Sequence, residues 1–516
     1  MEATRISLVN LRKQRLEKVQ KLLNLGINPY PSKSNRTNKI IEIIEKFNEF
    51  ENKVVVLSGR LMALREHGML VFGNIEDQDS NIQLYIKKDT INPYTKKDSN
   101  LGFEELKLLD IGDFVEAKGT ITKTERGEIS ILVNKLWILT KAIRPLPDKW
   151  KGIVDKEQRY RRRYLDLAMN IDIRQMFIRK AKFWEICREF MKNNGFFEVE
   201  TPILEYKTGG ADARPFVTHH NDLGIDLYMR ISSELYQKRL IGGGFENIFT
   251  LGPNFRNEGV DDEHLQEFTA LEWYWAYANY EDNMKLVQKL FLELSGKVYG
   301  KTEITSRGFT YDLSKVWEVI NYSNVIKEKL KIDIYTSTES EMIDVIKNHH
   351  IELKGKINRN RLIDNCWKII RKDIAGPAFL IDVPKFMSPL AKSMDSSNEI
   401  TERFNIIIAG SELGNGYSEI NDPIDQLTRF KEQEKARLSG DEESQMLDID
   451  YVEMLEYGMP PTSGFGMSER FFWFLEDCFA REGVLFPLMR PEVDNTTKEI
   501  YPELFSQKFP QNKQNK

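Results

Sequence analysis

The chain has 516 residues, a length that suggests about three domains at roughly 150 residues each. Hydrophobic residues make up 41% of the sequence and charged residues 30%, a balance that is typical of a globular protein and excludes wholesale disorder. The 74 basic and 79 acidic residues give a net charge of −5. This charge excludes a uniformly basic surface for nucleic acid, so any nucleic-acid binding must be local.

Cysteine usage and apolar runs indicate the cell compartment. Cys187, Cys366 and Cys478 lie far apart and form no CxxC pair, and such a sparse, odd number indicates a reducing compartment. The N-terminal residues contain no apolar segment of a secretory signal. No apolar run approaches the roughly 18 residues that a membrane span needs. We therefore expect a cytoplasmic protein that is not embedded in a membrane.

Residues 1–50 are predicted to form an N-terminal basic helix and a lead-in segment. Apolar residues recur at near-helical spacing between about 4 and 26. Residues 1–30 contain six basic and two acidic side chains. Two interpretations stay open for the basic face, namely a solvated helix surface and a contact for nucleic-acid phosphates.

Residues 51–148 have the pattern of a small β-barrel. Five short runs rich in β-branched and aromatic residues are separated by turns that contain Gly and Asp, which predicts an oligonucleotide/oligosaccharide-binding (OB) fold. Such a barrel presents aromatic and polar side chains on one face to unstacked bases. The candidates for that face are Arg60, Phe72, Gln83 and Glu128.

The rest of the chain divides into three parts. Residues 149–164 form a basic linker, and residues 165–491 read as a large α/β mixture with a helical insertion at about 300–375. The final segment, 492–516, is a polar tail without periodicity, which we expect to be mobile.

Three segments of the large region carry the pattern of a catalytic site. The first, 193–204, has a helix end, a Gly turn and an alternating strand. The second, 255–277, places Arg256 and Glu258 on one face of a strand. The third, 460–476, has closely spaced glycines that let a ligand approach the backbone, followed by Arg470 at the start of an aromatic helix, where its charge faces an anion.

In this order and spacing, the three segments resemble motifs 1, 2 and 3 of the class II aminoacyl-tRNA synthetases. The preceding OB-type barrel is similar to the subgroup for aspartate, asparagine and lysine. Five further segments resemble the lysyl-tRNA synthetases: 208–216, 231–240, 387–392, 400–404 and 410–423. The resemblance implies an α+β fold, with an antiparallel catalytic sheet flanked by helices and preceded by the all-β barrel.

The resemblance also implies an enzyme of two steps, a lysine–tRNA ligase. Lysine carboxylate attacks the α-phosphorus of ATP, and the 3′ end of tRNA(Lys) then takes the lysyl group. Such a reaction needs fixed positive charge and orientation more than a nucleophile of the protein. The catalytic residues would be Arg256 and Arg470. The ATP-binding residues would be Arg256, Asn257, Glu258, His264, Leu265, Phe268, Glu412, Leu413 and Arg470.

A pocket for lysine should be acidic, because a buried ammonium is costly unless it is paired. By resemblance, the lysine-binding residues are Gly210, Glu234, Arg256, Glu272, Tyr274, Asn415, Tyr417 and Glu419. The aspartate enzymes have the sequence QSPQ where this chain has Ser232-Ser233-Glu234. An aspartate substrate would need a cation where these carboxylates stand.

The remaining implications concern the metal, the anticodon and the assembly. Mg²⁺ is expected as cofactor with ATP as co-substrate, held by Glu412 and by Asn405, where the family has a second Glu. This exchange predicts weaker Mg²⁺ binding. The barrel would read the anticodon through Arg60, Phe72, Gln83 and Glu128. Family members are homodimers with motif 1, here 195–204, at the interface.

Motif 3 also departs from the family, since it is one residue shorter before Arg470. The loss of one residue in a strand reverses side-chain facing, so the following turn must absorb the change. Two other functions stay open. One is a paralogue that lysylates a protein, but such paralogues lack the anticodon domain. The other is a non-catalytic tRNA-binding protein that has kept the fold.

Overall fold

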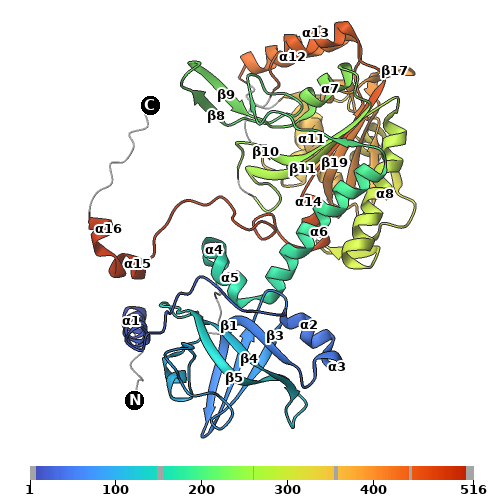
Figure 1. Ribbon diagram of the computed structural model, residues 1–516. Coiled ribbons are helices and arrows are strands. Elements are labelled where there is room, and N and C mark those ends of the chain that lie inside the picture. Colours follow the sequence, from blue (N-terminus) through green and yellow to red (C-terminus); the bar gives the residue numbers. More distant parts are fainter. Residues whose placement is uncertain are drawn as a thin grey trace. The chain divides into compact units, whose positions relative to one another are not determined.

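The computed structural model describes residues 7–147, 153, 155–259, 261–353, 358–440 and 444–506. The chain divides into two compact units, one of residues 1–175 and 489–516 and the other of residues 176–488 (Figure 1). Each unit is considered by itself. In the described residues, no helix is both long enough and apolar enough to cross a membrane.

The first unit contains a closed five-stranded barrel. Its strands are β1 (Val54–His67), β2 (Leu70–Glu76), β3 (Asn81–Lys87), β4 (Phe114–Lys123) and β5 (Ile129–Thr140). They pair in the order β1-β2-β3-β5-β4. Burial alternates along β2 and β3, as expected of strands with one face in a core. The barrel predicted for this region is confirmed.

Helix α1 (Leu8–Asn24) uses part of its basic face inside the first unit. Arg15 is buried and donates hydrogen bonds to the carbonyls of Ala142, Arg144 and Ile111 at 2.8–3.2 Å. Lys18 pairs with Asp110 at 2.8 Å. These two side chains therefore help to fix the helix within the unit and do not belong to a free phosphate-binding face. Two short helices, α2 (Ile40–Glu45) and α3 (Phe47–Phe50), follow.

The predicted linker and tail contain more regular structure than the sequence indicated. Helices α4 (Lys156–Arg161) and α5 (Arg163–Met169) cover the described end of the linker, and both Arg159 and Arg163 pair with Asp166. Residues 148–152 and 154 lie outside the described residues. The polar segment 492–516 contains α15 (Asn495–Ile500) and α16 (Pro502–Ser506). Arg162 pairs with Asp494 at 2.9 Å, just before α15 begins.

The second unit is built on an eight-stranded sheet in the order β14-β15-β18-β19-β20-β11-β10-β6. All neighbours are antiparallel except the pairs at the two edges, β14/β15 and β10/β6. This arrangement confirms the predicted antiparallel sheet. The strands are β6 (Phe197–Glu198), β10 (Asn247–Phe255), β11 (Glu267–Ala276), β14 (Glu318–Asn321), β15 (Ala378–Ile381), β18 (Arg403–Ile408), β19 (Ser411–Ser418) and β20 (Thr462–Ser468).

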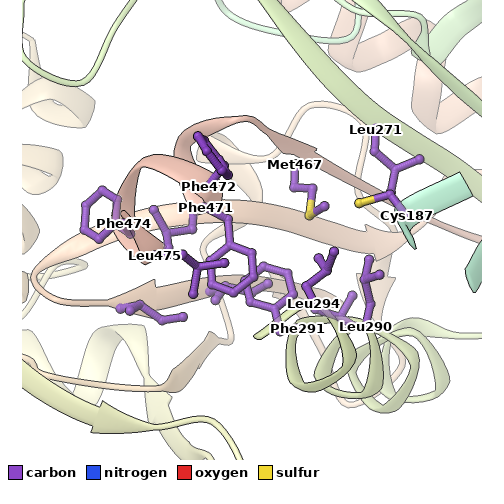
Figure 2. Packing of buried hydrophobic residues seen from close by; sticks show 14 of the residues in the cluster. Cys187, Leu271, Leu290, Phe291, Leu294, Met467, Phe471, Phe472, Phe474 and Leu475 are labelled. Carbon is purple, nitrogen blue, oxygen red and sulfur yellow. The ribbon is translucent and has the colours of Figure 1, made fainter. Parts of the chain in front are cut away.

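Helices flank this sheet, and the side chains of one group of helices pack against those of the sheet to form the main core (Figure 2). Phe471 of α14 (Arg470–Leu475) stacks on Phe291 of α8 (Tyr280–Tyr299), with ring centroids 3.9 Å apart. Cys187 of α6 (Ile171–Asn193) packs in the same core and is a free thiol, as are Cys366 and Cys478. This packing holds α14 against α8, and therefore fixes the position of Arg470, the first residue of α14.

The remaining helices of the second unit are α7 (Glu234–Gly242), α9 (Tyr322–Leu330), α10 (Glu339–Asn348), α11 (Arg359–Arg371), α12 (Pro423–Leu438) and α13 (Ile449–Tyr457). Within 300–375, α9, α10 and α11 surround a separate apolar cluster that includes Ile326, Ile346 and Trp367. The same stretch also holds the hairpin β12 (Glu303–Ser306) and β13 (Phe309–Asp312), and the edge strand β14. Small sheets join β7 (Leu204–Glu205), β8 (Val217–His220) and β9 (Ile225–Met229), and β16 (Ser393–Met394) with β17 (Ser397–Thr401).

Candidate active site

The largest described cavity of the second unit has a volume of about 390 Å³ and is lined by β10, β11, β19 and β20, with the start of α7. Most of the predicted site residues meet here. Those that line the cavity are Gly210, Glu234, Arg256, Glu258, His264, Leu265, Phe268, Glu272, Tyr274, Glu412, Leu413, Asn415, Tyr417, Glu419 and Arg470. Asn257 and Asn405 do not line it, although Asn257 donates its backbone N–H to the Arg214 carbonyl at 2.7 Å.

One end of the cavity is acidic. Glu234 begins α7, Glu272 lies on β11, and Glu419 directly follows β19. All three are buried. Antiparallel pairing brings them together, because β11 and β19 both pair with β20: Tyr274 and Tyr417 lie opposite Gly464. The sheet therefore collects carboxylates that are up to 185 residues apart in the sequence.

Hydrogen bonds fix two of these carboxylates. Glu272 accepts from the Ser232 hydroxyl at 2.8 Å, and from the N–H and hydroxyl of Ser233 at 3.0 and 2.6 Å. The Tyr417 hydroxyl donates to Glu234 Oε1 at 2.6 Å. Gly210 packs against this group with φ of +85°, and a Cβ there would lie 2.7 Å from the Glu234 Cβ. The acidic end is therefore an ordered arrangement in which the close approach at 210 requires Gly.

The sequence analysis missed Lys238, a buried lysine of α7 that contacts this acidic end. Its Nζ lies 2.7 Å from Glu234 Oε1 and 2.5 Å from Glu419 Oε2. Burial alone lowers the pKa of Lys238, but Glu234 and Glu419 raise it, and the net pKa is well above its ordinary value. Lys238 is therefore charged. The spacing of Glu234 and Lys238 on one helix face was a signal for their pairing, but nothing in the sequence indicated Glu419.

The cavity is also lined by arginines, of which Arg256 and Arg470 form what we call its cationic end. Arg256 lies just beyond β10, with its guanidinium 5.2 Å from the centroid of the Phe268 ring. Burial lowers the pKa of Arg256, and Glu258, Glu272 and Asp212 oppose that effect. Its Nε is buried with no hydrogen-bond partner among the described residues, so this nitrogen is left for a ligand acceptor.

Arg470 reaches the cavity although motif 3 is one residue short. Strand β20 ends at Ser468, and Glu469 exchanges backbone and side-chain hydrogen bonds with Thr269 of β11 at 3.0 and 3.3 Å. Helix α14 then begins at Arg470. The Arg470 guanidinium pairs with Glu263, which also accepts from Ser411 at 3.0 Å. Arg470 therefore lines the cavity directly after the turn that follows β20.

Glu412 lies where a metal ligand was expected, and its two carboxylate oxygens already accept hydrogen bonds. Trp367 of α11 donates to Oε1 at 2.6 Å, and Asn405 donates its amide N–H to Oε2 at 2.7 Å. Asn405 Oδ1 in turn accepts from Arg403 at 3.2 Å. Asn405 therefore orients Glu412 and presents no free oxygen to the cavity. The described residues contain no cluster of three or more His, Cys, Asp or Glu side chains arranged for a metal.

This donor set still fits Mg²⁺ bound together with a nucleotide. Mg²⁺ commonly uses one or two carboxylates and completes its shell with phosphate oxygens and water. Each carboxylate oxygen has two lone pairs, so Glu412 keeps acceptor capacity beyond its two hydrogen bonds. One side-chain carboxylate is therefore available at this position instead of two.

Three of the four predicted anticodon residues line a second pocket, of about 320 Å³, on the barrel of the first unit: Phe72, Gln83 and Glu128. Arg60 is not among the lining residues. It lies over the Phe114 ring at 4.3 Å and donates to the Gly112 carbonyl at 3.2 Å. Tyr85, which the sequence analysis missed, lies opposite Phe72 across β2 and β3 and stacks on it with centroids 5.3 Å apart. The alternation of β3 was the available signal.

Comparisons with known proteins agree with the folds of the two units. Residues 155–490 match the family of class II tRNA synthetases (D, K and N), and residues 55–139 match the OB-fold nucleic acid binding domain. The chain is 43% identical to the lysine–tRNA ligase of Thermosipho africanus, over 94% of this chain and 97% of that protein. The lysine–tRNA ligase of Thermotoga maritima gives the same values. For that of Fervidobacterium nodosum the identity is 43%, over 94% and 95%. The resemblance read from the motifs is confirmed: the chain belongs to the class II aminoacyl-tRNA synthetases, in the subgroup for aspartate, lysine and asparagine.

Proposed function

We propose that this protein is a lysine–tRNA ligase, which activates L-lysine with ATP to lysyl-adenylate and then transfers the lysyl group to the 3′ end of tRNA(Lys). The observation that carries the proposal is a single cavity that is lined both by three buried carboxylates and by arginines. The relatives named as lysine–tRNA ligases cover nearly the whole chain, which supports the same activity.

The acidic end selects lysine by charge. A lysine substrate brings two ammonium groups, and each needs a buried anionic partner. Glu234 and the backbone at Gly210 receive the α-ammonium, while Glu272, Tyr274 and Glu419 receive the ε-ammonium. Glu419 Oε1 is buried and has no hydrogen-bond partner among the described residues. Aspartate in this place would face these carboxylates with a carboxylate of its own, so the pocket rejects it.

The cationic end performs the first step by holding charge in place. Arg256 binds the lysine carboxylate and the α-phosphate together, because its planar fork donates two parallel hydrogen bonds. The bound oxygens are then aligned for attack on phosphorus, and the developing negative charge is stabilised. Phe268 stacks on the adenine and Glu258 accepts from its amino group. His264 and Arg470 contact the terminal phosphates, and Asn415 and Tyr417 help to fix the amino acid.

Magnesium is the proposed cofactor, with Glu412 as its protein ligand. When it is bound, the ion draws negative charge from the ATP phosphates and so helps pyrophosphate to leave. Asn405 keeps the Glu412 carboxylate oriented through its 2.7 Å hydrogen bond. Because a neutral amide replaces one carboxylate, we expect Mg²⁺ dependence with weaker binding than a site of two carboxylates gives.

The barrel pocket is the proposed anticodon site. The partly exposed ring of Phe72 stacks on an unpaired base, and Gln83 and Glu128 bond base edges. This barrel argues against the protein-lysylating paralogues, which lack such a domain. The pocket residues do not include Arg60, so its role in base recognition stays a prediction from the resemblance.

We also propose a cytoplasmic homodimer. The motif 1 segment exposes apolar side chains, with Phe197 at 63% and Leu204 at 48% of their full accessible area. Apolar side chains that are left exposed in this segment support its burial against a second copy of the chain. Three buried free cysteines fit a reducing compartment.

Lysine-dependent exchange between ATP and labelled pyrophosphate, without tRNA and with Mg²⁺ varied, tests the first step. We expect exchange with lysine and none with aspartate or asparagine. Arg256→Lys should reduce kcat by roughly 10²- to 10³-fold, because a point charge cannot replace the bidentate fork. Arg179→Lys is the matched control, since Arg179 forms a bidentate pair with Glu476 and does not line the cavity. No exchange from folded wild-type protein would favour the non-catalytic tRNA-binding alternative.

A further inference from the structure

We propose that Lys238 is a positioning residue that determines specificity for lysine. Its buried ammonium group lowers the negative charge of the lysine pocket and determines which carboxylate oxygen is left to accept a hydrogen bond from the substrate. The inference rests on the proposed function and deepens it. Lys238 does not line the cavity, so it acts on the substrate through Glu234 and Glu419 and is not itself a catalytic group.

Lys238 contacts both of the carboxylates that it would position. Its side chain is completely buried, and its Nζ lies 2.7 Å from Glu234 Oε1 and 2.5 Å from Glu419 Oε2. The Tyr417 and Tyr451 rings lie 5.7 Å from Nζ on their own elements, β19 and α13. An ammonium held in this way cannot leave without exposing two buried anions to an apolar surrounding.

The formal charges of the pocket match lysine only when Lys238 is counted. Glu234, Glu272 and Glu419 carry three negative charges, and Lys238 reduces them to two. The two ammonium groups of the substrate then neutralise the remaining two charges. Without Lys238, one carboxylate would stay buried and uncompensated in the complex, which is unfavourable.

Lys238 also determines which oxygen is left for the substrate. It takes Glu419 Oε2, whereas Glu419 Oε1 stays buried with no hydrogen-bond partner among the described residues. That free oxygen faces the backbone of β20, since a Cβ built on Gly464 would lie 2.3 Å from it. The missing side chain of Gly464 leaves room for Glu419 itself, so that the orphaned Oε1 is held against β20 as the acceptor that remains for the substrate ε-ammonium.

Protonation of the two carboxylates provides a readout that a purely structural lysine would not affect. Burial raises the pKa of Glu234 and of Glu419, and Lys238 opposes this rise. The other titratable or charged groups around them are Glu272, Tyr274, Tyr417, Tyr451 and Arg403. The pKa values of both carboxylates stay above their ordinary value with Lys238 in place, and removal of its ammonium should raise them further, which favours a proton on one carboxylate.

The test compares Lys238→Met with wild type in lysine-dependent ATP–pyrophosphate exchange and in lysine binding by calorimetry, from pH 6 to 9. We expect Lys238→Met to raise the lysine KM by at least about tenfold and to leave the ATP KM within about twofold. The increase should be largest at pH 6 and smaller at pH 9, because the protonated carboxylate cannot pair with an ammonium and regains its charge as the pH rises.

Lys141→Met is the matched control. Lys141 is also completely buried between two carboxylates, Asp110 at 2.5 Å and Asp113 at 2.7 Å, but it belongs to the first unit. Its loss should lower stability and leave the lysine KM unchanged. The variant Lys238→Gln keeps a hydrogen-bond donor beside Glu234 and Glu419 but removes the charge. It should show the same lysine-specific, pH-dependent rise in KM, and it carries the test if Lys238→Met does not fold.

The outcomes separate this inference from the proposed function. Wild-type protein without lysine-dependent exchange would overturn the proposed function whatever the variants do. Active wild type with an unchanged lysine KM in Lys238→Met would overturn the role of Lys238 alone. Equal increases in the lysine KM and the ATP KM, with no dependence on pH, would also overturn the role of Lys238, because they would indicate a general loss of structure in the variant.

Discussion

Buried ionisable residues lower the free energy of unfolding of the second unit, and Glu205 on β7 is one of them. Burial raises the pKa of Glu205 to about 8, against the opposing charges of Arg230 and Arg239, while Glu272 and Asp448 add to the rise. Glu205 is only 3% exposed. At neutral pH it is therefore protonated in the folded protein and ionised in the unfolded chain, so it opposes folding.

Glu205→Gln should stabilise the protein in a pH-dependent way. Near pH 4 the carboxyl is protonated in both states, so the substitution should have almost no effect. Between the ordinary value of 4.5 and about 8, the folded state binds more protons than the unfolded state, so wild-type stability falls as pH rises. The gain from Gln should reach at most on the order of 4 kcal/mol above pH 8. Urea unfolding at pH 4, 6 and 8.5 measures it.

An exposed glutamate provides the control for this pH series. Glu453 on α13 is solvent-exposed, so Glu453→Gln should change the urea midpoint little at any of the three pH values. A gain from Glu205→Gln of the same size at pH 4 and pH 8.5 would contradict the assignment of the effect to the buried carboxyl.

At the residue scale, the sequence motifs predicted the acidic and basic residues that line the cavity. They did not predict the neighbouring residues that hold those side chains in position. Glu234, Glu272 and Glu419 were assigned to one pocket, and they line one cavity. Lys238 was missed because its partner Glu419 is 181 residues away, and only the folded sheet makes them neighbours. Metal binding by Asn405 stays a prediction, and its hydrogen bonds with Glu412 and Arg403 are contacts that no single-sequence pattern reveals.

At the scale of elements, β20 carries a glycine, Gly464, whose missing side chain leaves room for Glu419 and Tyr274. Gly464 lies opposite both Tyr274 of β11 and Tyr417 of β19. A Cβ at this position would lie 2.3 Å from Glu419 Oε1 and 2.5 Å from the Tyr274 ring. Gly466 lies two residues along on the same strand, where the nearest atom to a Cβ would be Glu272 Cγ at 3.7 Å.

Gly464→Ala should therefore damage the lysine pocket while Gly466→Ala serves as a control. The methyl group at 464 must displace Glu419 or Tyr274, and we expect the lysine KM to rise roughly 10²-fold with little change in the ATP KM. At 466 the added methyl makes ordinary contact, so the lysine KM should stay within about threefold of wild type. Steady-state exchange kinetics measures both. Equal effects of the two substitutions would contradict this account of β20.

Element prediction succeeded where local patterning agrees with the fold. The strands of the barrel follow from alternation, and α1 from apolar spacing. The prediction of a basic linker was less accurate, since Arg159 and Arg163 in that segment pair with Asp166. The polar segment after 491 forms α15 and α16. Its helices are short and have no apolar periodicity, so sequence pattern alone could not indicate them.

The whole molecule separates two tasks between two units. The cavity proposed for lysine and ATP is lined by residues of the second unit, and the pocket proposed for the anticodon is lined by residues of the first. Each unit has its own apolar core. A substitution on the barrel should therefore change recognition of tRNA without changing the activation of lysine.

Phe72→Ala should lower kcat/KM for tRNA by roughly 10- to 100-fold, the value of one lost base–aromatic stack. Lysine-dependent pyrophosphate exchange without tRNA should stay at the wild-type rate. Trp137→Ala is the control, because Trp137 is a half-buried aromatic residue of β5 that does not line the barrel pocket. Equal losses from the two substitutions, or a loss of exchange in Phe72→Ala, would argue against an anticodon site at this pocket.

The central claim, ligation of lysine to tRNA, is tested most directly by the attachment of labelled lysine to unfractionated tRNA in the presence of ATP and Mg²⁺. We predict ATP-dependent, alkali-labile attachment of lysine that saturates at a small fraction of the tRNA, with no attachment of labelled aspartate or asparagine. Failure of folded protein to attach lysine, or attachment of aspartate or asparagine in its place, would contradict the account.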